Sequence, residues 1–114
     1  MVIRIDLGPD HWIGHGKIEL LEAVDVHGSI TAAGRAINMS YKRAWDLIEE
    51  TNGIFGRDVV ERQVGGNGGG STALTDFGRE LIARYHRIER AAAKAARDDL
   101  AALQSNTARR KQTS

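Results

Sequence analysis

The sequence contains no cysteine and a single proline, and only 5% of its 114 residues are aromatic. A chain without cysteine has neither a disulfide framework nor a thiolate metal site, which is compatible with a reducing compartment. The sequence also lacks a signal peptide and an apolar run long enough to span a bilayer, so we expect a cytoplasmic chain that does not enter the membrane. Its 41% apolar content is enough for one compact core.

Catalytic and metal-binding motifs are absent from the sequence as well. His11 and His15 have the four-residue spacing of helical metal ligands, but Pro9 and Gly14 argue against a helix there. The glycine-rich run at residues 65–70 lacks the lysine that a nucleotide-binding phosphate loop requires, and no serine lies in a Gly-x-Ser-x-Gly motif. We therefore expect no enzymatic activity, no metal site and no cofactor.

The most informative segment is residues 28–45, GSITAAGRAINMSYKRAW, which predicts two short helices joined by a tight turn. Ser29 and Ser40 are suited to cap these helices, because a serine hydroxyl accepts a hydrogen bond from an early helical N–H. Asn38 tolerates the left-handed conformation that ends one helix and begins a turn. The apolar stripe of the first helix consists of Ile30, Ala33 and Ile37.

In the second helix we expect a buried stripe that includes Tyr41 and Trp45 and leaves Lys42 and Arg43 exposed in the first turn. This arrangement is typical of a helix-turn-helix, in which the first turn of the second helix enters the DNA major groove. The alternative for these residues alone is an ordinary helical domain with a solvated Lys–Arg pair. The predicted DNA-binding residues of this segment are Ser29, Thr31, Ser40, Tyr41, Lys42 and Arg43.

The next segment, VVERQVGGNGGGSTALT, predicts two short strands joined by a glycine-rich tip, as in the wing of a winged helix. Arg62 lies at the base of this hairpin, where it can hold a phosphate or enter the minor groove. At the tip we expect Gly66, Asn67 and Gly68 to approach the DNA, because glycine leaves the backbone unobstructed. The alternative is a flexible hairpin without a role.

The two ends of the chain complete the predicted fold. The N-terminal run VIRIDL alternates apolar and polar residues and predicts a strand that adds to the wing sheet. A helix from about residue 14 to 27 follows, with Ile18, Leu21 and Val24 facing the core. A last helix over about residues 75–104, begun by Thr75 as its cap, is roughly 45 Å long. We expect residues 105–114 to form a disordered basic tail.

This last helix outreaches so small a domain, and its far half therefore needs a partner. We expect a homodimer, because a two-fold pair of such domains presents two recognition helices about one DNA turn apart. A solvated single helix is the alternative, since Ala, Arg, Glu and Lys are strong helix formers. The predicted dimerisation residues are Leu81, Tyr85, Ile88, Ala92, Ala95 and Leu103.

Over residues 17–85 the sequence resembles a known family. The helix-turn-helix GSITAAGRAINMS is similar to that of LysR-type regulators. The motif SYK-x-AWD, followed by ER-x-x-GG-x-GGG and ALT-x-FG, resembles more closely the N-terminal DNA-binding domain of the ModE family of molybdate-responsive transcriptional regulators. The resemblance implies a bacterial regulator that binds DNA as a homodimer, with residues 40–43 and the wing at the interface.

The sequence departs from that family in ending at Ser114, where ModE proteins continue into oxyanion-binding modules. We therefore expect a stand-alone regulator or one that works with a separate sensor protein. The net charge of +1 also predicts that a few placed side chains, rather than bulk charge, give the affinity for double-stranded DNA.

The predicted fold class is α+β, mainly α: a winged helix-turn-helix over residues 1–104, with a two-stranded wing and a long C-terminal dimerisation helix. The predicted function is transcription regulation at an inverted-repeat operator, with a link to molybdenum. The alternative is a protein-interaction module that docks a sensor subunit through its long helix.

Overall fold

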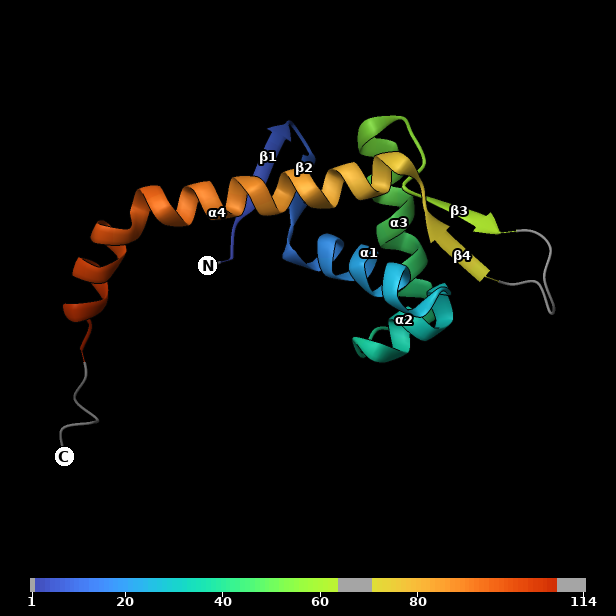
Figure 1. The fold of residues 1–114 in the computed structure, drawn as a ribbon, viewed down its shortest axis with the longest axis horizontal. Coiled ribbons are helices and arrows are strands. Elements are labelled where there is room, and N and C mark those ends of the chain that lie inside the picture. Colours follow the sequence, from blue (N-terminus) through green and yellow to red (C-terminus); the bar gives the residue numbers. More distant parts are fainter. Residues whose placement is uncertain (1, 64–70, 109–114) are drawn as a thin grey trace.

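The computed structural model describes residues 2–63 and 71–108. In chain order its elements are β1 (Arg4–Gly8), β2 (His11–Gly14), α1 (His15–His27), α2 (Ile30–Ala36), α3 (Tyr41–Phe55), β3 (Val60–Gln63), β4 (Ser71–Leu74) and α4 (Asp76–Ser105). Figure 1 shows α1, α2 and α3 as a body with the β3–β4 hairpin at one end, while α4 crosses this body and extends beyond it. This confirms the predicted mainly helical winged fold with a long C-terminal helix.

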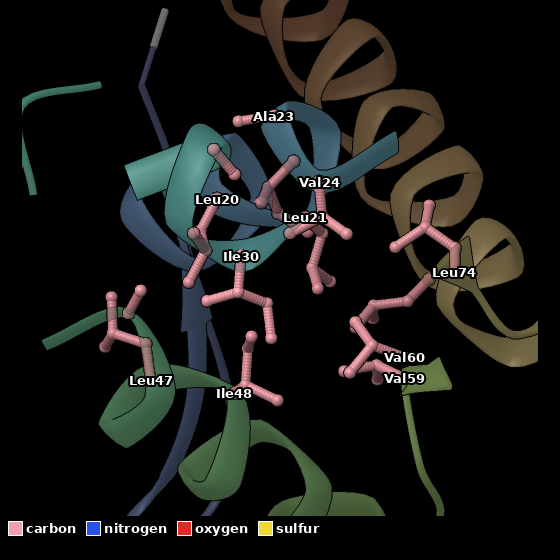
Figure 2. Close-up of a cluster of buried hydrophobic side chains, with 14 of the residues drawn as sticks. Leu20, Leu21, Ala23, Val24, Ile30, Leu47, Ile48, Val59, Val60 and Leu74 are labelled. Atoms are coloured by element: carbon pink, nitrogen blue, oxygen red, sulfur yellow. The ribbon is translucent and has the colours of Figure 1, made fainter. Parts of the chain in front are cut away.

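The core lies where the three short helices, the wing and α4 meet. Ile18, Leu21 and Val24 of α1 are buried, as their spacing predicts. Figure 2 shows side chains of α1, α2 and α3 converging with Val59, Val60 and Leu74 from the base of the wing. Because each element has one apolar face, burying these faces together is the main source of stability. Among the described residues, none of the helices combines the length and the apolar content needed to cross a membrane.

The N-terminal strand corrects one prediction. It does not join the wing sheet, because β1 pairs antiparallel with β2 in a separate two-stranded sheet. The turn between them explains this pairing: Gly8 and Asp10 have φ angles of 140° and 61°, so the chain reverses within a few residues. A local hairpin costs much less closure entropy than pairing with a strand sixty residues away.

Two polar contacts hold this hairpin against the body. The Tyr85 hydroxyl of α4 donates a 2.8 Å hydrogen bond to the carbonyl oxygen of Ile3, and burial raises the pKa of this tyrosine. The buried Lys17 ammonium lies 3.6 Å from the centre of the Trp12 ring and 3.0 Å from a carboxylate oxygen of Glu50. The N-terminal segment is thus fixed to α4 through Tyr85 and to α1 through Lys17, which in turn pairs with Glu50 of α3.

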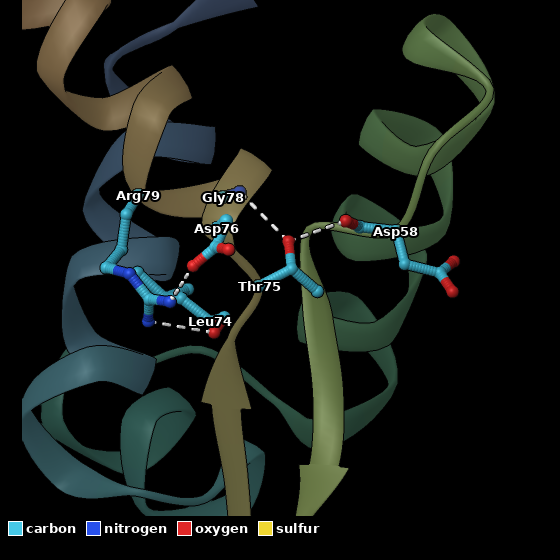
Figure 3. Close-up of polar contacts among 6 residues, drawn as sticks. All are labelled: Asp58, Leu74, Thr75, Asp76, Gly78 and Arg79. Carbon is cyan, nitrogen blue, oxygen red and sulfur yellow. Dashed lines mark hydrogen bonds and ion pairs between the residues drawn. The ribbon is translucent and has the colours of Figure 1, made fainter.

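Polar contacts and a close backbone approach join the wing to α4 (Figure 3). The Thr75 hydroxyl caps α4 by accepting a 3.0 Å hydrogen bond from the Gly78 N–H, and it donates a 2.7 Å bond to the carbonyl oxygen of Asp58. The Arg79 guanidinium reinforces the turn with a 3.0 Å bond to the carbonyl oxygen of Leu74. Behind these contacts, Gly78 lies so close to Val59 that a Cβ atom would overlap the Val59 carbonyl oxygen.

We predict that Gly78→Ala destabilises the fold by about 3 kcal/mol, because the overlap is with backbone and no side chain can move to relieve it. Gly53→Ala is the matched control: Gly53 also lies in a helix, but its added Cβ meets nothing within 4 Å. That variant should gain up to about 1 kcal/mol from helix propensity. Urea unfolding of the two variants checks the prediction, and equal stabilities would contradict it.

A histidine links the middle of α4 to α1. The Nε2 atom of His86 lies 2.5 Å from a carboxylate oxygen of Glu22, and its Nδ1 atom lies 3.0 Å from one of Glu89. The hydrogen bonds to Glu22 and to Glu89 raise the pKa of His86 above its usual 6.5. The imidazolium form therefore stabilises the attachment of α4 to α1.

Because the pKa of His86 is raised in the folded state, its contribution to stability is fully present below about pH 6.5. The contribution declines as the pH rises through the folded-state pKa. We predict that His86→Gln is clearly less stable than the native sequence at pH 6 and that this difference shrinks at pH 8.5. Urea unfolding at both pH values tests this, with His11→Gln as the control. A difference independent of pH would contradict it.

Candidate nucleic-acid interface

The helix-turn-helix is held by a close approach between α2 and the turn that follows it. Ser29 caps α2 by accepting a 3.0 Å hydrogen bond from the Ala32 N–H, as predicted. Asn38 adopts the expected left-handed conformation, with a φ of 59°. A Cβ on Gly34 would lie 2.8 Å from the carbonyl oxygen of Met39, so only glycine lets the turn come this close. These contacts set the position from which α3 begins.

The first turn of α3 presents its polar side chains to solvent. Ser40 caps the helix by accepting a 3.1 Å hydrogen bond from the Arg43 N–H, which confirms the predicted cap. Lys42 and Arg43 are both exposed. The Lys42 ammonium lies 3.0 Å from a carboxylate oxygen of Asp46, one turn further along the helix. No described residue forms an ion pair with the guanidinium of Arg43.

The predicted buried Tyr–Trp stripe is wrong for Tyr41, which is 56% exposed. The residues that seat α3 are Ala44, Leu47, Ile48 and Thr51, and this buried face begins one turn after Tyr41. Trp45 lies at its edge, half-buried, with its ring 6.4 Å from the Tyr41 ring in an edge-to-face arrangement. Tyr41 therefore belongs to the surface that carries Lys42 and Arg43.

The wing is tied directly to the helix-turn-helix. In the β3–β4 hairpin Arg62 lies opposite Thr72. The backbone N–H of Thr72 donates a 2.8 Å hydrogen bond to the carbonyl oxygen of Gly28, at the start of the turn into α2. The tip of the wing, with the predicted residues Gly66, Asn67 and Gly68, lies outside the described residues.

A polar hollow of about 190 Å³ lies where these elements meet. Its lining comes from the N-cap and first residues of α2, from the start of α3 and from both wing strands: Ser29, Ile30, Thr31, Tyr41, Trp45, Arg62 and Thr72. The fold thus brings together four of the predicted DNA-binding residues, namely Ser29, Thr31, Tyr41 and Arg62. Among the described residues, Arg62 is the only charged one in this lining, which also includes the hydroxyl-bearing residues Ser29, Thr31, Tyr41 and Thr72. Such a set of donors suits an anionic oxygen.

Sequence reasoning missed Thr72. Its position opposite Arg62 in the hairpin could have indicated it, but that register can be predicted only when the length of the loop between the two strands is known.

The predicted dimerisation residues lie in two settings on α4. Leu81 and Tyr85 are buried within the chain, whereas Ile88, Ala95 and Leu103 are exposed and Ala92 is half-buried.

Among residues 2–63 and 71–108, no group of three or more His, Asp or Glu side chains is placed to hold a metal ion.

Comparison with known proteins identifies the fold and the family. Residues 15–79 match the family described as bacterial regulatory helix-turn-helix protein, LysR family. The chain belongs to this LysR family. The matched region contains the helix-turn-helix and the wing, so the hollow and the first turn of α3 belong to the DNA-binding domain of a transcription regulator.

Within the LysR-type sequences, the chain is similar to ModE proteins. It is 44% identical over 73 residues to the molybdenum transport protein ModE of Azotobacter vinelandii, covering 64% of this chain and 27% of that protein. It is 39% identical over 79 residues to the DNA-binding transcriptional dual regulator ModE of Escherichia coli, covering 69% and 30%. The chain thus spans less than a third of the length of these curated relatives.

A solved structure supports the same fold. The crystal structure of the CbnR_DBD–DNA complex matches with a TM-score of 0.60 at 19% identity, covering 77% of this chain and 95% of that chain. At this identity the match shows that the two chains share a fold. The winged helix-turn-helix and the ModE resemblance predicted from the sequence are therefore confirmed.

Proposed function

We propose that this domain acts as a homodimer on an inverted-repeat operator, with the first turn of α3 in the major groove and the wing on the flanking backbone. The observation that carries the proposal is the single surface formed by the exposed residues 40–43 and the adjoining hollow. A major-groove reader needs a protruding first turn and a neighbouring backbone anchor, and the two lie side by side here.

Lys42 and Arg43 have different roles in this proposal. Lys42 is paired with Asp46, and both side chains are exposed, so the pair contributes little and a DNA phosphate can replace the carboxylate. Arg43 presents a planar guanidinium with which no described residue forms an ion pair, and this group matches the O6 and N7 acceptors of guanine in the major groove. We therefore assign base recognition to Arg43 and phosphate binding to Lys42, with Ser40 and Tyr41 at the DNA backbone.

The hollow is the proposed anchor for one backbone phosphate. Its charged group is Arg62, and Ser29, Thr31 and Thr72 contribute hydroxyl-bearing side chains to the same lining. No described carboxylate lines the hollow, so an entering phosphate meets no like charge among these residues. Because the lining comes from both the wing and the helix-turn-helix, one phosphate in the hollow would fix the position of the wing relative to α3.

Arg43→Ala should weaken binding to the preferred duplex by about 1–3 kcal/mol and relax the preference at one base pair per half-site. Selection of the native and variant proteins on a random duplex pool, followed by sequencing, measures this directly. If the variant instead binds every sequence more weakly by the same factor, Arg43 is a phosphate contact.

Arg62→Gln should leave the selected motif unchanged and reduce the dependence of affinity on salt. Each lost phosphate contact makes the negative slope of log K against log salt shallower by about 0.9. A dimer that loses one contact in each protomer should therefore have a slope shallower by about 1.8. Titrations on the selected duplex between about 50 and 200 mM salt, a range over which phosphate contacts change the affinity strongly, measure the slope. Arg97→Gln, on the far half of α4, is the control, and an equal slope change in both variants would contradict the assignment.

The proposed regulator is linked to molybdenum, because the relatives that it resembles include one named molybdenum transport protein ModE. Those relatives are more than three times as long as the matched region, so we assign molybdate sensing to a module other than this domain, such as a separate sensor protein. If the random pool enriches no motif at physiological salt, the alternative applies, in which the long helix docks a sensor subunit.

A further inference from the structure

A row of basic side chains runs along one face of α4. Arg87, Arg90 and Lys94 follow one another at intervals of three and four residues, so they are neighbours on the helix surface. All three residues are exposed. The row extends over about 10 Å of the helix axis. We call these three residues the basic stripe.

The basic stripe lies on the side of α4 that faces away from the body. The side that faces the body is marked by Tyr85, which is 2% exposed and bonds to the Ile3 carbonyl oxygen, and by His86, which bonds to Glu22 of α1. Tyr85 and Lys94 are nine residues apart, or about two and a half helical turns, so they lie on opposite sides of α4.

The position of α4 also separates the basic stripe from the candidate nucleic-acid interface. Figure 1 shows that the far half of α4 extends on the side of the body opposite the β3–β4 hairpin. A straight duplex held by the first turn of α3 and the wing therefore does not pass the outer side of α4. An anion that meets the basic stripe must come from another molecule or from a distant part of the same DNA.

The positive charge of the basic stripe is not neutralised by the residues that the structure describes. The carboxylates of α4 nearest to it pair with other side chains: Glu80 with Arg84 at 2.7 Å, Glu89 with His86 at 3.0 Å and Asp98 with Arg97 at 3.8 Å. No described carboxylate forms an ion pair with a residue of the basic stripe. Like charges at these helical spacings repel one another, so a bound anion would stabilise them.

The composition of this face favours DNA over a folded protein. Positions 83, 91 and 101 on the same face are alanines, so the basic stripe has no large apolar side chain beside it on this face. A protein interface normally has an apolar or aromatic centre, with the charges at its rim. DNA can be bound through its phosphates alone, and over about 10 Å of its axis a duplex carries about six of them. Arginine, which provides two of the three cations, binds phosphate oxygens in a bidentate manner.

We propose that the basic stripe binds the phosphate backbone of a second DNA duplex while the helix-turn-helix holds the first. The chain thereby bridges two DNA segments. Because the basic stripe contacts phosphates only, the second duplex is bound without sequence preference, and its binding weakens steeply as the salt concentration rises. This inference goes beyond the proposed function, and it does not depend on how copies of the chain assemble.

Retention of one duplex by another measures this bridging. The selected duplex is fixed to beads and loaded with the full chain, and the retention of a labelled duplex without the motif is measured at about 50 mM salt. Arg87→Gln/Arg90→Gln should lower the retention at least about tenfold, because two phosphate contacts are lost, and leave the affinity for the selected duplex unchanged.

The matched control is Arg84→Gln/Arg97→Gln. It removes the same charge from the same helix, but at two arginines that already pair with carboxylates. This variant should retain the labelled duplex as the native chain does. All four arginines are exposed, so the folded state should persist in both variants.

Four results would overturn the inference. If both double variants lose retention equally, the bulk charge of α4 is responsible and not the basic stripe. If Arg87→Gln/Arg90→Gln also weakens binding to the selected duplex, the basic stripe contacts that same duplex. If the native chain retains labelled polyglutamate as well as it retains DNA, the surface fits an acidic peptide. If this double variant sediments differently from the native chain without DNA, the basic stripe contacts a second copy.

The assay also separates this inference from the proposed function. A failed DNA selection refutes the proposed operator, but any single duplex can then replace the selected one on the beads. The comparison of the two double variants keeps its meaning in that case, because it concerns only the second duplex.

Discussion

The close approach of Gly78 to the backbone of Val59 is the contact on which the rest of the structure depends. It lets the first turn of α4 pack directly on the segment that leads into the wing. The Thr75 hydroxyl joins the two segments, because it accepts a hydrogen bond from Gly78 of α4 and donates one to the carbonyl oxygen of Asp58. One side of this junction fixes the base of the β3–β4 hairpin next to the helix-turn-helix. The other side fixes the direction in which α4 leaves the body. The candidate nucleic-acid interface and the projecting helix therefore share one anchor.

The candidate interface follows from a second constraint, the hydrogen bond from the Thr72 N–H to the carbonyl oxygen of Gly28. This bond places the wing strands beside the start of α2, so Arg62 lines the same hollow as Ser29 and Thr31, which lie about thirty residues earlier in the chain. Few cations are needed when they are placed this way. In the proposed arrangement, a chain with a net charge of +1 holds DNA at two points, the first turn of α3 and the hollow, and still discriminates between sequences.

The local features of the fold could be predicted from the sequence, and the non-local ones could not. Ser29, Ser40 and Thr75 cap their helices because a cap depends on residues three positions away. The wrong pairing assigned to the N-terminal strand and the wrong burial assigned to Tyr41 have a common cause. The alternation or helical spacing of apolar residues identifies the apolar face of a strand or helix. It does not indicate which distant element packs on that face, or how much of the face is buried. Thr72 was missed for the same reason, since its neighbours come from across the hairpin and from the turn before α2.

The most direct test of attachment to DNA at these two points uses the selected duplex with single phosphates replaced by neutral methylphosphonates, one position at a time. The affinity of the native chain and of Arg62→Gln is measured for each modified duplex. If the hollow holds a phosphate, one position in each half-site will weaken the native protein and have little further effect on the variant, because both changes remove the same contact. If every position weakens the two proteins equally, Arg62 does not hold a phosphate, and the hollow is not the second point of attachment to DNA.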